Sequence, residues 1–415
     1  MRPIRVFIVF ALVTAVLSLA VIFVTGSHIK PHTSEYEEVI ANIFSGKGFV
    51  LPNAKFHLDY RAGIHPLFTY ICAGIYAVTG HSFLAVLIFQ VFISILTAYL
   101  IFKLGAMLFN EKAGLFAAAL AMLHPAQLIY STTKIHSQVL DTFFFVLIVY
   151  YILLASRTRN ARDFILLGLF TGIGSLARGT LIVLIPIGAV YFILNAQGRK
   201  AAALRNVCMT AVAAVLVLSP WWIRNYSIFK KPVYMTTESM GYVMWVGFNE
   251  NATGTLYKSP DVSLFEGAPK ELRQKIWAIK DEMGQQEAFR KEAIDFIKRN
   301  PSKALRLYLN RIAYFWWFTP TEGAYYPKAY YDIYKAYYIT VIILAAVGLI
   351  AAFRRRLPAL KDLIFLMFAM FFLGLLQSFY YVEGRHRWEI EPVLLLFTAY
   401  GLTRFLPSWR RSKQQ

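Results

Sequence analysis

The sequence predicts an all-α, polytopic membrane protein with about ten transmembrane helices and two long extracytoplasmic segments. Hydrophobic residues make up 58% of the 415 residues and charged residues only 16%, whereas roughly a quarter of a soluble domain is charged. The mean hydropathy is +0.50. Apolar runs of the length needed to cross a bilayer recur along the chain. These observations exclude a disordered, fibrous or ordinary soluble protein.

The first span is expected over residues 4–24. Its apolar run is longer than the roughly 7–15 residues of a signal-peptide core, so we interpret it as an uncleaved helix. The other expected spans lie at 82–102, 114–131, 138–155, 163–177, 180–195, 206–222, 333–353, 362–380 and 388–406. The pair 163–177 and 180–195 is short, and a broken or re-entrant hairpin remains an alternative.

Basic residues orient these helices. Six segments carry them, and ten spans place all six on one side: Arg2 and Arg5; Lys103 and Lys112; Arg157, Arg159 and Arg162; Arg199, Lys200 and Arg205; Arg354, Arg355, Arg356 and Lys361; Arg410, Arg411 and Lys413. Short loops rich in Lys and Arg mark the cytoplasmic side. We therefore expect both termini in the cytoplasm, and we assign the net charge of +20 to these loops rather than to nucleic-acid binding.

Three regions follow from this topology. Residues 1–222 form an N-terminal transmembrane region that includes a first extracytoplasmic loop at 26–81, and residues 333–415 form a C-terminal transmembrane region. Residues 223–332 are expected to be an extracytoplasmic, partly helical domain. The apolar positions of 270–299 have a helical period, and Pro269 and Pro301 flank them.

Ionisable residues gather at the predicted outer ends of the spans, which suits an anionic substrate at the outer surface. The candidate acids are Glu35, Glu38 and Asp59. Glu35 and Glu38 are three residues apart and share a helical face, so one of them could act as a general base. The alternative is a capping box, in which Thr33 or Ser34 caps a helix and the acids favour its dipole.

Basic residues at the same ends are candidates for binding phosphate. They are Arg61, His65, Arg178, Arg224, Arg385, His386 and Arg387. A guanidinium group can bind phosphate through two parallel hydrogen bonds. Anchoring at the membrane boundary is the alternative, above all for Arg224 within Pro-Trp-Trp-Ile-Arg-Asn-Tyr. Three basic residues in one short outer loop, at 385–387, favour the phosphate interpretation.

Four stretches in order resemble the protein-mannosyltransferase and aminoarabinose-transferase type of membrane glycosyltransferase, family 39 of the GT-C superfamily. They are Glu35-Tyr36 through Gly46-Lys47-Gly48-Phe49 to His65-Pro66-Leu67; Gly172 to Arg178; Pro220 to Tyr226 followed by Gly247 to Gly254; and Arg385-His386-Arg387 through Pro392 to Leu402. The resemblance covers most of the chain and is weakest at 255–330.

The resemblance implies a GT-C-like helical bundle and an inverting transferase of the cell membrane whose site faces the extracytoplasmic side. The donor would be a sugar on a polyprenyl phosphate, and the acceptor a hydroxyl of a lipid, glycan or protein. One carboxylate base would suffice because polyprenyl phosphate is a good leaving group, and cations would stabilise it. No cofactor is assigned, and a divalent metal ion stays open.

Two departures from the family pattern put this activity in question. Family members usually carry an Asp four residues before Tyr36, where this chain has His32, and a Ser-Glu pair where it has Ser137-Gln138. Glu35 and Asp141 are the nearest replacements. A catalytically inactive homologue is therefore one alternative. A glycolipid transporter or flippase and a lipid-oligosaccharide ligase or polymerase are the others.

Overall fold

The computed structural model describes residues 3–33, 35–259, 262–319 and 327–403, and the described part is mostly helical. Six of its helices are long and apolar enough to cross a membrane. They are α1 (Pro3–Val24), α4 (Phe83–Leu108), α7 (Gln138–Thr158), α10 (Lys200–Phe229), α15 (Lys328–Arg354) and α16 (Leu360–Gln377). This confirms the all-α class with several membrane-spanning helices.

The remaining expected spans coincide with shorter or broken helices. The helices α5 (Glu111–Met122) and α6 (Pro125–Thr133) make a seventh candidate if they count as one span bent by 50°. Pro125 lacks the N–H that would continue α5, which explains the break. The others are α8 (Ala161–Ala177), η1 (Gly179–Val183) with α9 (Leu184–Leu194), and α18 (Glu391–Leu402). The described residues thus support six or seven spans by length and composition, and a count of ten is not established.

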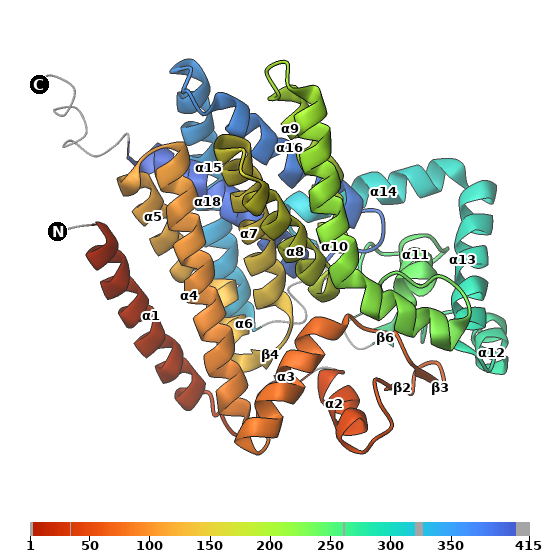
Figure 1. The fold of residues 1–415 in the computed structure, drawn as a ribbon. Coiled ribbons are helices and arrows are strands. Elements are labelled where there is room, and N and C mark those ends of the chain that lie inside the picture. Colours follow the sequence, from red (N-terminus) through yellow and green to blue (C-terminus); the bar gives the residue numbers. More distant parts are fainter. Residues whose placement is uncertain (1–2, 34, 260–261, 320–326, 404–415) are drawn as a thin grey trace, which may run out of the picture.

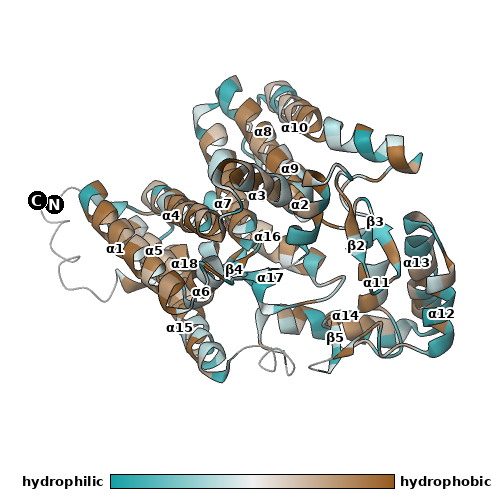
Figure 2. Ribbon diagram, turned by 90° about the horizontal axis from the view of Figure 1, so that it is seen from below, coloured by the Kyte–Doolittle hydropathy of each residue, from teal (hydrophilic) through white to brown (hydrophobic). Residues whose placement is uncertain are grey.

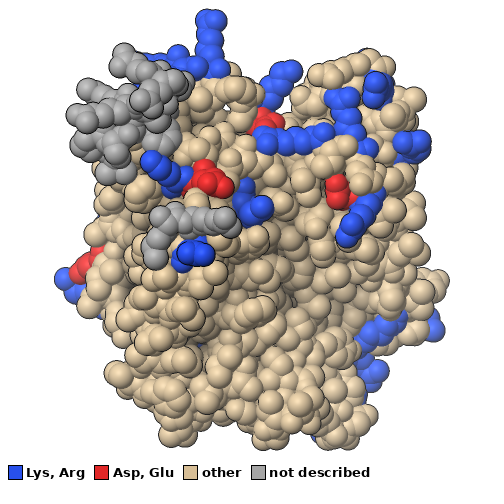
Figure 3. Space-filling view, turned by 60° about the vertical axis from the view of Figure 1, so that its left-hand side comes forward, with Lys and Arg blue, Asp and Glu red and all other residues tan. Residues whose placement is uncertain are grey.

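The basic loops lie together at one end of this bundle. The loops that join α4 to α5, α7 to α8, α9 to α10 and α15 to α16 are all at the upper end in Figure 1. Figure 3 shows Lys and Arg side chains along the same end, above a broad surface without charges. Arg2, Arg410, Arg411 and Lys413 lie outside the described residues. The arrangement matches the expected clustering of charge on one side.

The segment at 26–81 contains more structure than a loop. It holds β1 (His32–Thr33), α2 (Tyr36–Phe44), the antiparallel hairpin of β2 (Leu51–Asn53) and β3 (Leu58–Tyr60), and α3 (Pro66–Thr79). Helix α3 was not expected. Pro66 begins it, and Gly80 ends it with a φ of 69°, a conformation that glycine adopts without strain.

The segment at 223–332 begins within the last turns of α10 and ends within the first turn of α15. It holds η2 (Glu238–Met240), α11 (Tyr242–Gly247), the antiparallel strands β5 (Tyr257–Ser259) and β6 (Val262–Ser263), α12 (Lys270–Ala278), α13 (Glu282–Arg299) and α14 (Pro301–Trp316). A helix was predicted over 270–299, and the structure breaks it at Ile279 into α12 and α13. In Figure 2 the hydrophilic segments, among them β3 and α12, lie beside the mostly hydrophobic bundle.

The two long segments pack against each other through an aromatic cluster and one buried acid. The Phe56 ring lies 4.9 Å from Tyr242 and 5.3 Å from Phe289. The Glu282 carboxylate accepts hydrogen bonds from the backbone N–H groups of Arg61, at 2.6 Å, and Ala62, at 3.2 Å. These contacts fix the β2–β3 hairpin to α11 and α13, and so fix one wall of the cavity described next.

Candidate active site

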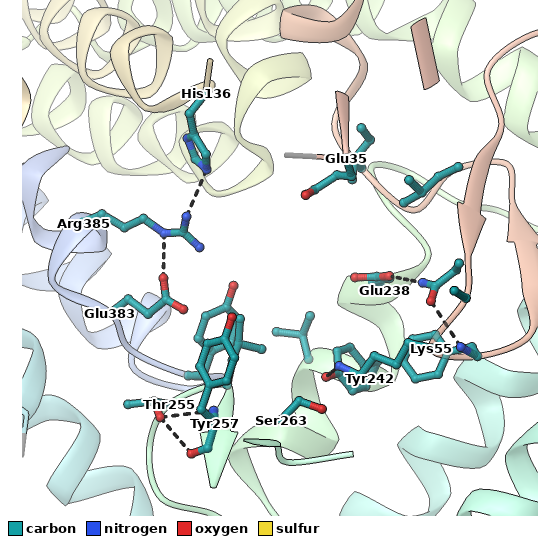
Figure 4. A pocket seen from close by; sticks show the side chains of 18 of the residues that line it. Glu35, Lys55, His136, Glu238, Tyr242, Thr255, Tyr257, Ser263, Glu383 and Arg385 are labelled. Atoms are coloured by element: carbon teal, nitrogen blue, oxygen red, sulfur yellow. Dashed lines mark hydrogen bonds and ion pairs between the residues drawn. The ribbon is translucent and has the colours of Figure 1, made fainter. Parts of the chain in front are cut away.

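A cavity of about 750 Å³ opens where the two long segments meet the ends of the bundle. Its volume falls within the range of about 300–1,000 Å³ that is typical of small-molecule sites. Segments far apart in the sequence supply its charged side chains: His32, Glu35, Glu38, Lys55, Lys134, His136, Glu238, Glu383 and Arg385. Figure 4 shows the labelled members of this set arranged around an open centre.

Basic groups from two elements form one side of the cavity. Arg385 lies in α17 (Gly384–Trp388), and its Nε is 2.7 Å from the Glu383 carboxylate. Its Nη1 lies 3.0 Å from His136 Nε2 and donates to the Tyr130 hydroxyl at 3.2 Å. Lys134 belongs to β4 (Lys134–Ile135), which pairs in parallel with β1. This short pairing brings the start of α7 beside the start of α2.

The His136 ring makes this side rich in hydrogen-bond donors. Burial, reinforced by the nearby Arg385 guanidinium, holds the pKa of His136 well below its usual value, so the ring is neutral. Its Nδ1 accepts from the backbone N–H of Gln138 at 3.1 Å. A neutral ring has one N–H, and the tautomer that carries it on Nε2 presents a donor beside the guanidinium. An anionic oxygen at this point would accept from the guanidinium and, in that tautomer, from the ring.

Two acids predicted from the sequence lie at the rim of the same cavity. Glu35 is the N-cap residue of α2 but makes no side-chain capping bond, and its carboxylate projects into the open centre in Figure 4. Glu38 follows in the first turn and also lines the cavity. The structure therefore gives Glu35 no capping-box contact. Glu37 has a packing role instead, because it accepts from the Tyr76 hydroxyl at 2.7 Å.

The opposite wall carries two ionisable residues that sequence reasoning missed. Glu238, in η2, accepts from the Asn53 side-chain amide at 3.2 Å. Burial, with repulsion from Glu35, raises the pKa of Glu238 to about 8. Lys55, between β2 and β3, donates to the Tyr242 hydroxyl, and burial lowers the pKa of Lys55 to about 8. Nothing local in the sequence marks these residues, because only tertiary packing brings them together.

Three predicted residues of the first segment do not line the cavity. Asp59 is exposed on β3 and Arg61 is exposed just after it. His65 is half-buried and accepts from the backbone N–H of Gly179 at 2.9 Å. Burial, with the Arg178 charge, lowers the pKa of His65 to about 4, which keeps the ring neutral and able to accept. His65 thereby fixes α3 to the tip between α8 and η1.

Arg178 and Arg224 bind protein groups away from the cavity lining. Arg178 pairs with Glu389 at 2.9 Å and with Asp141 at 3.2 Å. Arg224 donates to the backbone carbonyl of Phe49 at 3.1 Å, and its guanidinium lies 4.6 Å from the centre of the Trp221 ring. Neither residue lines the cavity in the structure.

The two residues after Arg385 point into the protein. His386 is buried and forms a capping box with Glu383. Arg387 is fully buried and donates to the carbonyls of Phe315, at 3.0 Å, and Trp317, at 2.9 Å, while its Nε pairs with Glu391 at 3.0 Å. Of the predicted set, the structure thus brings Glu35, Glu38 and Arg385 together. Across residues 3–403, apart from the undescribed gaps, no three His, Cys, Asp or Glu side chains are grouped to hold a metal ion.

Comparison with known proteins supports the resemblance noted in the sequence. A family model for dolichyl-phosphate-mannose-protein mannosyltransferases matches residues 64–223. None of the curated proteins matches the chain. The GT-C resemblance is therefore confirmed by a family model over this part of the chain.

Solved structures of one oligosaccharyltransferase share the fold over nearly the whole chain. The Archaeoglobus fulgidus oligosaccharyltransferase AglB, in complex with an inhibitory peptide and a dolichol-phosphate, has a TM-score of 0.57 at 12% identity, covering 96% of this chain and 50% of that one. The apo form of the Archaeoglobus fulgidus oligosaccharyltransferase has a TM-score of 0.58 at 13% sequence identity, covering 97% of this chain and 51% of that one. ArnT from Cupriavidus metallidurans, bound to undecaprenyl phosphate, has a TM-score of 0.45 at 14% sequence identity, covering 92% of this chain and 77% of that one. This chain spans about half the length of the oligosaccharyltransferase, whose likeness shows a GT-C fold.

Proposed function

We propose that this protein is a membrane glycosyltransferase that moves a sugar from a polyprenyl phosphate donor to a hydroxyl of a lipid, glycan or protein. The donor lipid would reach the site from the outer leaflet of the cell membrane. The cavity is the single observation that carries the proposal. It opposes carboxylates at Glu35 and Glu38 to a donor-rich side at Arg385 and His136, which is what inverting transfer from a phosphate requires.

The reaction assigns a role to each side. Glu35 accepts the proton of the acceptor hydroxyl, whose oxygen attacks the anomeric carbon from the face opposite the phosphate. The bond between this carbon and the phosphate oxygen breaks, and polyprenyl phosphate leaves with the electron pair. Arg385 and the His136 N–H donate to the departing phosphate, where negative charge increases in the transition state.

The origin of the charged lining favours a transferase over a transporter. Transporters place their substrate sites near the bilayer midplane, commonly in broken spanning helices. Among the described residues, every charged or histidine side chain that lines the cavity comes from outside the six spanning candidates. The site is therefore built from the segments between the spanning candidates, which supports a transferase that works at the membrane surface.

The inactive-homologue alternative rests on His32 and Gln138. His32 lines the cavity, where burial and the Lys134 charge lower its pKa, so it is neutral and could accept a proton only weakly. Gln138 is buried. The proposal therefore depends on Glu35 acting from the adjacent turn.

Reconstitution tests the proposal. The purified chain is placed in liposomes with a panel of polyprenyl-phosphate sugars, and release of polyprenyl phosphate and formation of the glycoside are measured. We expect Glu35→Gln and Arg385→Ala each to lower kcat/KM at least about a hundredfold. Glu111→Gln, at the start of α5, is the matched control and should retain activity. Full turnover by both site variants would refute these assignments.

A further inference from the structure

The wall opposite Arg385 has the chemistry of a second binding site. It carries an amide–carboxylate pair, Asn53 and Glu238, and an ammonium group, Lys55, seated against the Tyr242 ring. In Figure 4 Glu238 and Lys55 face Arg385 and His136 across the open centre, and Glu35 projects between the two sides. We infer that this wall binds a carbohydrate acceptor, so that the accepting hydroxyl belongs to a sugar rather than to a peptide; this rests on the proposed transferase function.

The amide–carboxylate pair suits a sugar hydroxyl. The Asn53 amide donates to one oxygen of Glu238 at 3.2 Å, which holds the carboxylate in one orientation. With its pKa raised to about 8, Glu238 carries its proton at neutral pH, so the carboxyl group has one O–H donor as well as free acceptor sites for a ligand. Sugar hydroxyls both donate and accept, and the nearby Lys55 ammonium supplies donors for their oxygens. Thr255 and Ser263 add hydroxyl groups to the lining.

Aromatic rings supply the apolar part of a sugar site. Tyr242, Tyr257 and Tyr381 line the cavity. A tyrosine has a flat apolar face and one polar hydroxyl. The face can pack against the C–H face of a pyranose while the hydroxyl forms a hydrogen bond with a hydroxyl at the edge of the sugar. The Lys55 ammonium lies 4.4 Å from the centre of the Tyr242 ring, which keeps that ring in place.

The wall is rigid before any ligand binds. The Trp277 indole N–H donates to the backbone carbonyl of Lys55 at 3.1 Å, and the Gln286 side chain accepts from the backbone N–H of Tyr242 at 2.8 Å. Glu282 also accepts from the Thr237 hydroxyl, next to Glu238. Preorganised side chains cost less entropy on binding, which is a property of dedicated sites.

A peptide would use different features. Peptides are commonly bound through main-chain pairing on a strand edge or through apolar side-chain pockets. The wall instead presents carboxylate, amide, ammonium and phenol groups around a cavity that already contains the proposed phosphate side. The same chemistry would recognise a free oligosaccharide or the sugar of a glycolipid.

The test uses the full chain in liposomes with a polyprenyl-phosphate sugar and three acceptors: a short oligosaccharide, a glycolipid with the same terminal sugar, and a Ser/Thr peptide. We expect Asn53→Ala and Lys55→Met to raise the KM for sugar acceptors about tenfold or more, as loss of hydrogen bonds to charged groups does. Donor affinity should change by less than about twofold. The control Lys280→Met alters an exposed lysine in the same region and should leave both constants unchanged.

The outcomes separate the two proposals. Equal transfer to the oligosaccharide and the glycolipid would make the sugar alone the recognised group, whereas preference for the glycolipid would add its lipid; either supports the wall as a sugar site. Transfer to the peptide only would overturn the sugar site. So would wall variants that weaken binding of the donor and leave binding of the acceptor unchanged. If the oligosaccharide binds the wild type by calorimetry and these variants lose that binding, but nothing is transferred, the proposed function fails while the sugar site stands.

Discussion

The Arg178 guanidinium lies 2.9 Å from the Glu389 carboxylate and also donates to the Gln377 amide oxygen at 3.1 Å. Gln377 and Glu389 are the two residues that flank the 378–388 segment, and their side chains bond to each other at 2.8 Å. Arg178 therefore holds together both ends of the segment that carries Glu383 and Arg385. This makes it a positioning residue for the cavity rather than part of its lining.

Replacing Arg178 should therefore destabilise the protein as well as impair donor binding. In Arg178→Ala the buried Glu389 and Asp141 lose their charged partner, a change that typically costs about 3–5 kcal/mol. We expect a lower Tm in detergent, and a raised donor KM in whatever fraction stays folded. Arg178→Lys keeps the charge but not the planar fork, so it should recover only part of the Tm.

The matched control is Arg290→Ala, which breaks an exposed pair with Glu287. Its effect should stay within about 1 kcal/mol. A normal Tm for Arg178→Ala combined with complete loss of donor affinity would instead favour direct contact with the phosphate, as the sequence alone suggested.

Arg385 should contribute to donor affinity as well as to the chemical step. Its guanidinium lines the cavity beside His136, and loss of one charge-assisted hydrogen bond costs about 1.5–3 kcal/mol, or roughly 10- to 100-fold in Kd. We expect this loss for Arg385→Ala in a binding assay with polyprenyl phosphate, and a smaller loss for Arg385→Lys. Arg306→Ala, on the exposed face of α14, is the control. Unchanged affinity in Arg385→Ala would remove the phosphate side of the mechanism.

The half-buried Glu238 and Lys55 should make stability depend on pH in two opposite ways. The raised pKa of Glu238, about 8, means that the folded state holds a proton that the unfolded chain loses near its usual value of 4.5. Stability should therefore fall as the pH rises from about 4.5 to 8. The lowered pKa of Lys55, also about 8, makes stability rise between pH 8 and its usual 10.5.

Two variants separate these contributions. Glu238→Gln should flatten the decrease in Tm between pH 5 and 8, and Lys55→Met should flatten the increase above pH 8. Thermal unfolding in detergent across this range measures both. If Glu238→Gln leaves the decrease below pH 8 unchanged, the Glu238 carboxyl is not the group responsible.

The sequence predicted the bundle better than the site, for a physical reason. Long apolar runs identify spanning helices one at a time, so α1, α4 and α7 were expected close to their observed bounds. Helix α3 was missed because its 14 residues are too few for a search based on runs of about 20. A helix of this length is recognised only from its contacts with neighbouring elements.

The site depends on contacts between distant segments. Glu35 and Arg385 could be proposed from charge near a span end, but Glu238 and Lys55 meet only when η2 packs on the β2–β3 hairpin. Arg387 shows the reverse difficulty. A charged residue in an outer loop suggests phosphate binding, yet Arg387 is satisfied by Glu391 and backbone carbonyls inside the protein. Composition cannot tell a buried structural arginine from a ligand-binding one.

Close packing of α15 on α18 provides a last test, of the fold itself. A Cβ atom at Gly348 would overlap the backbone carbonyl oxygen of Phe397, and one at Gly401 would lie 2.6 Å from that of Leu344. The Thr398 hydroxyl donates to the Val341 carbonyl at 2.9 Å across the same contact. Small residues permit such an approach between membrane helices.

Gly348→Ala should therefore force these two helices apart and lower stability by about 1–3 kcal/mol, the usual cost of overpacking. Gly74→Ala, within α3, is the matched control because nothing lies within 4 Å of the added Cβ. It should be neutral or stabilising by up to about 1 kcal/mol, since alanine is the better helix former. Unfolding of both variants in the same detergent compares them directly, and equal Tm values would mean that α15 and α18 do not pack this closely.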